Sequence, residues 1–163
     1  MKDLRVYKPN KAGTGAATKI QVVEKEKQRG QSVFKEIVVF FESANQVGTD
    51  DDDNAKFSWG TPDGDKGDTI TVKLGMSDVG EFLTVLTGRK NFVGPSDKGL
   101  FHKTSDTQNK GLSFSFAEGR GYNFRISVKD EKGLRAISHT FSFAEAELLR
   151  VVLEEAVRLY YRG

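Results

Sequence analysis

A strand-to-helix junction occurs twice in this sequence, and the repetition sharply narrows the choice of fold. Segment 69–74 alternates apolar and polar residues, stops at Gly75 and runs into apolar residues at helical spacing. Segment 134–141 leads into a second helix of this kind. At an offset of 67 residues the two junctions match at five apolar pairs: Ile70 with Ile137, Leu74 with Phe141, Met76 with Phe143, Phe82 with Leu149, and Leu86 with Leu153. Five matches in one structural context indicate a duplicated unit.

Each copy of the unit is predicted to be a group of strands that a helix follows. Alternation, or β-branched and aromatic content, predicts strands at 4–7, 18–23, 33–43, 55–60, 69–74, 100–103, 112–116, 122–128 and 134–141. Because the connections are short, neighbouring strands are expected to be antiparallel. The fold class is therefore α+β, with two antiparallel four-stranded sheets, each followed by a helix. A single domain is expected over 1–163, with repeats 1–95 and 96–163.

The sequence also predicts which parts of the strands and helices are buried. Segment 33–43 is so rich in apolar residues that we expect a strand buried on both faces. Phe40, Phe82 and Phe141 are accordingly predicted to be core rings.

The helix starts can also be predicted. Ser77 and Asp78 are expected to cap the first helix, because short polar side chains accept hydrogen bonds from the unpaired N–H groups there. Ser142 followed by Glu145 has the spacing of a capping box, which predicts the start of the second helix.

Composition excludes several classes of protein. The chain has 163 residues and no cysteine, which removes disulfide scaffolds, zinc fingers, iron–sulfur centres and thiol nucleophiles. No cofactor or metal is expected. The longest apolar run, 37–41, is too short to span a membrane. Residues 1–5 lack the apolar core of a signal peptide, so we expect a cytoplasmic protein.

Catalysis is not expected. The two histidines, His102 and His139, both lie inside predicted strands, and neither belongs to a recognisable catalytic or metal-binding motif. The sequence contains no Gly-x-Ser-x-Gly elbow and no phosphate-binding loop.

The charges are segregated along the chain, although the total is only +2. Residues 1–35 have a net charge of +6, residues 36–68 of −7, residues 69–142 of +4 and residues 143–163 of −1. A partner responds to local patches, because salt screens exposed charges over about 10 Å. The near-neutral total therefore does not exclude a polyanionic partner.

Seven of the nine acidic residues of segment 36–68 lie within 48–68, a stretch that resembles an insertion. Its Asp-, Gly- and Asn-rich composition predicts two surface loops around the short strand 55–60. These loops are either plain solvated surface or a mimic of a nucleic-acid strand that competes for the binding surface.

Cations and aromatic rings alternate in several predicted strands. Single-stranded nucleic acid is bound by cations that contact phosphates and by rings on which bases stack. Alternation places Arg5 and Tyr7 on one face, and Phe57 and Trp59 on one face. The alternative is that the rings are core and the cations surround it. Chosen by charge, ring and position, the candidate contacts are Arg5, Tyr7, Lys8, Lys11, Lys19, Lys35, Trp59 and Lys73.

The second half of the chain resembles the Whirly family of single-stranded-DNA-binding proteins. The residues that carry the resemblance lie, in the same order, in segments 70–82, 100–103, 121–128 and 144–147. Together they span about 95 residues, more than half of the chain. The Lys-Gly-Lys-Ala-Ala-Leu motif of the family and its transit peptide are absent. The sequence therefore fits a bacterial, archaeal or phage relative, with association with a nucleoid as one option.

The resemblance implies two four-stranded sheets, each followed by a helix, and assembly into tetramers through the helices. We therefore expect a homo-oligomer, either a dimer or a tetramer. It implies sequence-tolerant binding of single-stranded DNA across sheet edges, in replication, repair or transcription. PUR repeats and guide-RNA-binding proteins share the duplicated plan, so an RNA-binding chaperone is an alternative. A protein-interaction module without enzymatic activity is another.

Overall fold

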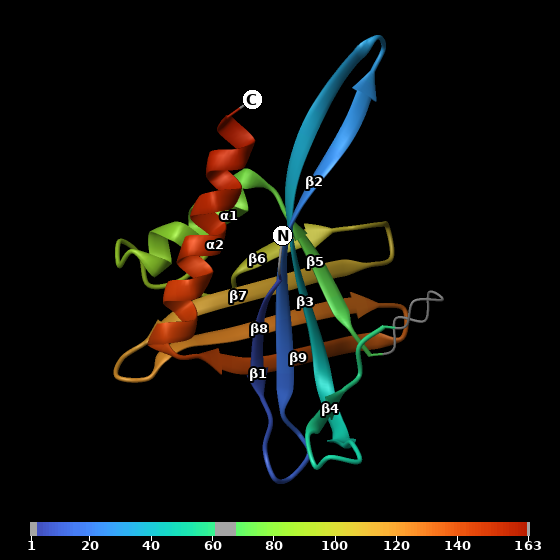
Figure 1. Cartoon of the computed structure of the whole chain (residues 1–163), viewed down its shortest axis with the longest axis vertical. Helices are drawn as coiled ribbons and strands as arrows, with labels where there is room; N and C mark the ends of the chain where they lie inside the picture. The colour runs from blue at the N-terminus through green and yellow to red at the C-terminus, as the bar shows by residue number, and fades with distance from the viewer. Residues whose placement is uncertain (1–2, 61–67, 163) are drawn as a thin grey trace.

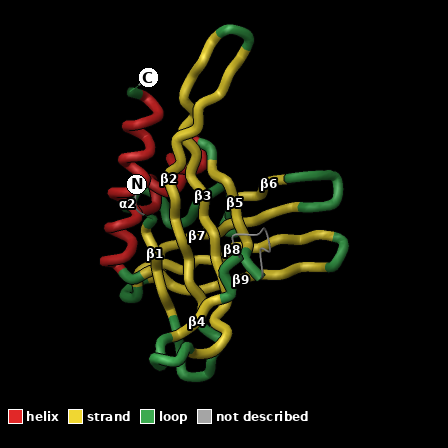
Figure 2. Tube along the Cα trace, turned by 45° about the vertical axis from the view of Figure 1, so that its right-hand side comes forward, coloured by secondary structure: helices red, strands yellow, loops and turns green. Residues whose placement is uncertain are grey.

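The computed structural model describes residues 3–60 and 68–162. Two antiparallel sheets cross each other, and two helices pack together along one flank of the pair (Figures 1 and 2). The predicted class is confirmed: the protein is α+β, and each sheet is followed by a helix. Part of the acidic segment 48–68, residues 61–67, lies outside the described residues.

Sheet 1 is formed by the first half of the chain. Its elements are β1 (Leu4–Lys8), β2 (Ala16–Arg29), β3 (Ser32–Thr49), β4 (Ala55–Phe57) and β5 (Ile70–Leu74). The strands β1, β2 and β3 are neighbours in order, and the far edge of β3 is shared by two strands. β5 pairs with β3 over Val39–Ser43, and β4 pairs with it farther along, between Gln46 and Thr49. The sheet is therefore four strands wide, and the predicted strand 55–60 is shorter than expected.

Sheet 2 is a simple meander formed by the second half. Its elements are β6 (Leu100–Lys103), β7 (Asn109–Ala117), β8 (Gly121–Asp130) and β9 (Gly133–Phe141). Each strand pairs with the next one along the chain. Helix α1 (Met76–Leu86) follows sheet 1, and helix α2 (Phe143–Tyr161) follows sheet 2. Neither helix, as far as the structure describes them, is long and apolar enough to cross a membrane.

One hydrophobic core fills the space between the two sheets and the helices. The ring of Phe82 on α1 lies 5.1 Å from that of Phe41 on β3 and 5.1 Å from that of Phe114 on β7. Phe141 on β9 is also fully buried. Each aromatic ring removes a large apolar area from water, so this cluster holds the two sheets together. The core prediction for Phe82 and Phe141 is confirmed.

The paired strands β2 and β3 extend far beyond the rest of sheet 1. They stay in register out to Arg29 and Ser32, and the distal half of the hairpin stands clear of the body (Figure 1). We call residues 24–36 the arm. Val33 and Phe34 on it are 59% and 42% exposed.

The prediction that segment 33–43 is buried on both faces is therefore wrong for its first residues. Burial begins only at Ile37, where the strand reaches the core. Phe40 is also no core ring. It alternates with Phe41 and lies half-buried on the opposite face of β3.

The two helix starts differ from each other. The capping box of α2 is confirmed: the Ser142 hydroxyl accepts from the Glu145 N–H at 3.1 Å, and the Glu145 carboxylate accepts from the Ser142 N–H at 2.8 Å. In α1 the prediction that Ser77 caps the helix is wrong, whereas Asp78 does take part, from the N3 position. Gly75 occupies the N-cap position, and the Asp78 carboxylate accepts its N–H at 3.3 Å. The helix starts earlier because Gly75 follows the strand directly.

Candidate functional site

The outer face of sheet 1, which points away from sheet 2, gathers most of the predicted contacts. Thr18 on β2 contacts His139 of sheet 2, so residues that alternate with it point outward. Arg5 lies directly opposite Lys19 on β2. Phe40 on β3 lies opposite Lys73 on β5. Arg5, Tyr7, Lys19, Phe40 and Lys73 therefore share one surface.

Three aromatic rings form a cluster on this outer face. The ring centroids of Tyr7 and Phe57 are 5.5 Å apart, and those of Phe57 and Trp59 are 6.5 Å apart. Beside them in the register, Ala17 and Ala44 are fully buried although their side chains point outward, which indicates that the rings cover them. Tyr7 nevertheless remains 46% exposed. We call Tyr7, Phe57 and Trp59 the aromatic cluster.

Two lysines lie over rings on the same face. The ammonium of Lys19 is 4.8 Å from the centre of the Trp59 ring, and that of Lys25 is 5.3 Å from the centre of Phe40. Cation–π contacts of this kind hold a positive charge beside an aromatic surface. The outer face therefore combines rings with cations, as single-strand binding requires.

Most cations of the outer face also have a carboxylate neighbour. Lys19 lies 3.7 Å from Glu42, Lys73 lies 4.0 Å from Glu36, and Arg5 lies 3.5 Å from Asp3. A hydrogen bond from Lys27 is the main cause that lowers the pKa of Glu36. Arg5 and Lys73 are about half exposed, and ion pairs at such sites are worth at most about 1 kcal/mol, so a phosphate can compete for these two cations. The Lys19–Glu42 pair is less exposed, with side-chain exposures of 16% and 22%.

Arg5 is additionally tied to the aromatic cluster. A side-chain hydrogen bond with Tyr7 is the main cause that raises the pKa of Arg5 above its usual value. The positive charge of Arg5 is therefore present at every physiological pH.

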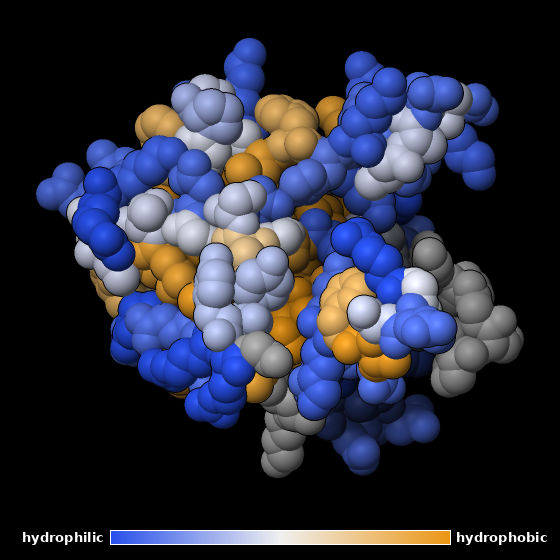
Figure 3. Space-filling model, turned by 90° about the horizontal axis from the view of Figure 1, so that it is seen from above, coloured by the Kyte–Doolittle hydropathy of each residue, from blue (hydrophilic) through white to orange (hydrophobic). Residues whose placement is uncertain are grey.

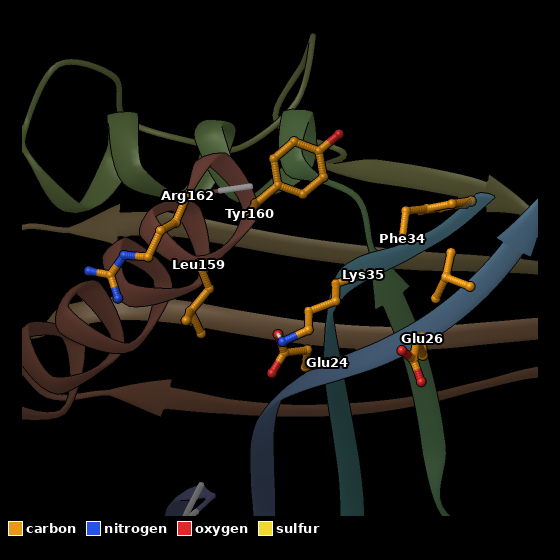
Figure 4. A pocket seen from close by; sticks show the side chains of 8 residues that line it. Glu24, Glu26, Phe34, Lys35, Leu159, Tyr160 and Arg162 are labelled. Carbon is orange, nitrogen blue, oxygen red and sulfur yellow. Dashed lines mark ion pairs between the residues drawn. The ribbon is translucent and has the colours of Figure 1, made fainter.

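Three of the predicted contacts lie elsewhere. Lys8 points toward the helices, where it forms an ion pair with Glu145 of α2. Lys11 is exposed in the turn that follows β1. Lys35 is on the arm and pairs with Glu24 at 3.3 Å. Figure 4 shows this pair in a groove between the arm and the end of α2. The eight candidates therefore do not form one site.

Sequence reasoning missed several members of the outer face. Phe57, Phe40 and Lys25 belong to it but were not among the candidate contacts. The alternation of Phe40 with Phe41 was the available signal, because neighbouring strand residues point to opposite faces.

The described residues offer no metal site. No group of three or more His, Asp or Glu side chains among residues 3–60 and 68–162 could hold an ion. His102 lies 3.0 Å from Asp78, but the two form only a pair.

No family model and no curated protein sequence matches the chain. Solved structures do match it over almost its whole length, and they define a Whirly-like fold. In particular, WHY3 from Arabidopsis thaliana superposes with a TM-score of 0.72 at 15% identity, over 98% of this chain and 88% of WHY3. The plant transcriptional regulator PBF-2 gives a TM-score of 0.70 at 16% identity, over 98% of this chain and 89% of PBF-2.

A third similar structure lies outside plants. MRP1/MRP2 from Trypanosoma brucei superposes with a TM-score of 0.58 at 16% identity, over 96% of this chain and 84% of that one. At such identities the likeness establishes the fold, and the expected Whirly-like architecture is confirmed.

Proposed function

We propose that the protein binds single-stranded nucleic acid, DNA foremost, with little sequence preference through the outer face of sheet 1. The observation that carries the proposal is the Lys19 ammonium 4.8 Å above Trp59, within a partly exposed cluster of three rings. Bases stack on the rings, and phosphates take the cations Arg5, Lys19 and Lys73 from their carboxylate partners. Stacking accepts any base, so recognition depends little on sequence.

The comparisons support a role in nucleic-acid metabolism. PBF-2, whose fold this chain shares, is a plant transcriptional regulator. By analogy of fold we place this protein in transcription, replication or repair, as a binding protein without catalytic activity.

Assembly into a homo-oligomer is part of the proposal. Several apolar side chains of α2 face solvent: Leu148 is 55% exposed and Val151 is 49% exposed. Figure 3 looks down on the end of the molecule that carries the C-terminus of α2, and apolar patches are visible there among hydrophilic side chains. The molar mass measured by light scattering during size-exclusion chromatography tests the proposed assembly. A dimer or tetramer supports it, and a monomer at high concentration contradicts it.

A titration tests the binding itself. Labelled oligonucleotides of about 30 nucleotides, as single-stranded DNA, single-stranded RNA and duplex DNA, are titrated at low and high salt while their anisotropy is followed. We expect single-stranded DNA to bind tightest and its affinity to fall steeply with salt. Preference for RNA would redirect the proposal to an RNA chaperone. Absence of binding to every strand at low salt would refute it in favour of a protein-interaction module.

The single tryptophan provides a direct readout of the site. Trp59 is the only tryptophan in the chain and belongs to the aromatic cluster. Stacking of a base on this cluster should therefore quench the intrinsic tryptophan fluorescence on titration with unlabelled strand.

A further inference from the structure

The outer face of sheet 2, which points away from sheet 1, differs from its counterpart in charge. The inward-facing residues of β7 and β8, such as Phe114, Phe124 and Ile126, are buried, so the residues that alternate with them point outward. The outward positions of β6 to β9 include three cations, Lys103, Arg125 and Lys129, and no Asp or Glu. Most of the others are small or hydroxylic.

The cations of this face are less neutralised than those of sheet 1. Lys103 has a carboxylate neighbour, Asp106, at 3.7 Å in the adjoining loop. Arg125 is exposed, and its cross-strand neighbours are the hydroxyl side chains Ser113 and Ser138. These serines also line a shallow groove of about 410 Å³ beside the guanidinium. Among residues 3–60 and 68–162, no carboxylate forms an ion pair with Arg125, so no carboxylate of these residues has to be displaced before an anion binds there.

An exposed ring lies near this groove, on the edge strand β6. Phe101 is 66% exposed and lies opposite Gly111 of β7. A Cβ at Gly111 would be 3.5 Å from the ring of Phe101 and only 2.7 Å from Ser127 Oγ. The glycine therefore lets the ring lie against the sheet, while most of the ring surface stays open to solvent.

The ring and the guanidinium are suitably spaced for one strand of nucleic acid. Phe101 on β6 and Arg125 on β8 are two strand spacings apart across the sheet, with β7 between them, and two residues apart along it. With strand spacings near 4.8 Å and a rise near 3.4 Å per residue, their Cα atoms are about 12 Å apart. A base stacked on the ring and a phosphate a short way along the same strand can bridge this distance.

We propose that the outer face of sheet 2 is a second contact surface for single-stranded nucleic acid. Phe101 stacks a base, and Arg125 binds a backbone phosphate in the serine-lined groove. This inference rests on the proposed function and extends it to a surface that shares no residue with the aromatic cluster. It also assigns to sheet 2 a phosphate contact that does not compete with an internal ion pair.

Two variants test the surface. Phe101→Leu keeps an apolar side chain and removes the ring, and Arg125→Gln removes one charge. Phe101→Leu is expected to weaken single-strand binding by about 5- to 150-fold, the range for one stacked base. Arg125→Gln is expected to lower the slope of log affinity against log salt by about 0.7, the value for one phosphate contact on a single strand.

A third variant and a control isolate the groove. Ser138→Asp places a carboxylate opposite Arg125 and should reproduce the loss seen with Arg125→Gln. Arg120 is an exposed arginine in the β7–β8 turn. Arg120→Gln is the matched control, because it removes the same charge outside the groove. Its affinity and salt slope should stay close to those of the unaltered protein. Circular dichroism verifies that every variant is folded.

The outcomes separate the two proposals. If the unaltered protein binds strands but Arg125→Gln and Phe101→Leu behave like Arg120→Gln, the second surface is refuted and the proposed function stands. If the unaltered protein binds no strand, both are refuted. Quenching of Trp59 at saturation should survive in the sheet 2 variants, since that residue reports on sheet 1. An equal loss of duplex affinity in Phe101→Leu would also overturn the inference, because paired bases cannot stack on the ring.

Discussion

The hydroxyl oxygen of Thr18 on β2 lies 2.5 Å from Nε2 of His139 on β9, and this contact links the two sheets. The other ring nitrogen, Nδ1, lies 3.0 Å from the carbonyl oxygen of Thr140 and donates to it. Nε2 is then the acceptor, and the Thr18 hydroxyl donates to it. Ser43 on β3 lies 2.6 Å from Thr18 and can donate in turn. The chain of hydrogen bonds fits a neutral histidine.

This arrangement predicts that the protein loses stability in mild acid. Burial is the main cause that lowers the pKa of His139, with a contribution from Lys8. The unfolded chain therefore takes up a proton at a higher pH than the folded protein, so the free energy of unfolding is largest above the unfolded pKa of about 6.5. It should fall as the pH drops below that value, by about 1.4 kcal/mol for each unit between the two pKa values.

Urea unfolding at a series of pH values from about 7.5 to 5.5 measures this dependence. The variant His139→Gln should show a flatter profile, because a glutamine does not titrate. Equal slopes for the variant and the unaltered protein would show that another group is responsible. The carboxylate of Glu145, whose pKa is lowered by Lys8 and Ser142 despite its burial, acts in a more acidic range.

The two helix starts predict opposite effects for two serine substitutions. Ser142→Ala should lower the free energy of unfolding by about 1 kcal/mol, because it leaves the Glu145 N–H without its side-chain acceptor. Ser77→Ala should be neutral or slightly stabilising, since Ser77 is exposed inside the first turn of α1 and alanine is the better helix former. Urea denaturation compares the two. A comparable loss for Ser77→Ala would mean that Ser77, not Gly75, caps α1.

The sequence predicted those features that depend on local patterns. Alternation, together with β-branched and aromatic content, located the strands, and the capping box located the start of α2. Alternation also placed Arg5 and Tyr7 correctly on one face, because neighbouring strand residues point to opposite sides whatever the rest of the fold.

Features that depend on the register between distant strands could not be predicted. Lys19 meets Glu42 only because β2 and β3 pair in one register, and Lys73 meets Glu36 for a similar reason. Charge totals for segments of sequence do not reveal such neutralisation. Lys8 was wrongly grouped with Arg5 and Tyr7. Since it directly follows Tyr7 on β1, alternation already places its side chain on the opposite face, where it pairs with Glu145.

The exposure of the arm and the charge of the outer face of sheet 2 could not be predicted either, because both depend on how whole elements pack in three dimensions. Phe34 looked like a core residue because the core's extent along β3 is set by the second sheet and the helices, not by β3. The lack of carboxylates at the outward positions of β6 to β9, where Arg125 lies, becomes visible only when the outward residues of all four strands are assigned together.

The aromatic cluster predicts a graded loss of binding. Trp59→Ala should weaken single-strand binding by about 1–3 kcal/mol, and Trp59→Phe should weaken it less because a ring remains. Lys19→Gln should remove one phosphate contact and lower the salt slope by about 0.7. Fluorescence anisotropy measures all three. Tyr161→Ala is the control, since Tyr161 is an aromatic residue at the end of α2 with 74% exposure. An equal loss in this control would argue against stacking on the cluster.

The acidic turn between β3 and β4 predicts a gain of binding when it is neutralised. The Asp50 carboxylate accepts the N–H groups of Asp52 and Asn54 at 2.9 Å each and so holds the turn, whereas Asp51, Asp52 and Asp53 expose their carboxylates. The turn leads directly into β4, which carries Phe57 of the aromatic cluster. Three negative charges therefore lie on the approach to the proposed site and should repel phosphates.

The triple substitution of residues 51, 52 and 53 by asparagine leaves Asp50 in place, so the turn is retained. Asparagine also suits residue 53, whose φ of 68° is in the left-handed region. We expect tighter single-strand binding at low salt and a smaller difference at high salt, because the Debye length falls from about 10 Å at 0.1 M to about 3 Å at 1 M. Neutralising three exposed acids elsewhere, Asp97, Glu118 and Glu131, controls for net charge. Unchanged affinity in the triple variant, or an equal gain in the control, would discard the idea that this turn competes with the strand.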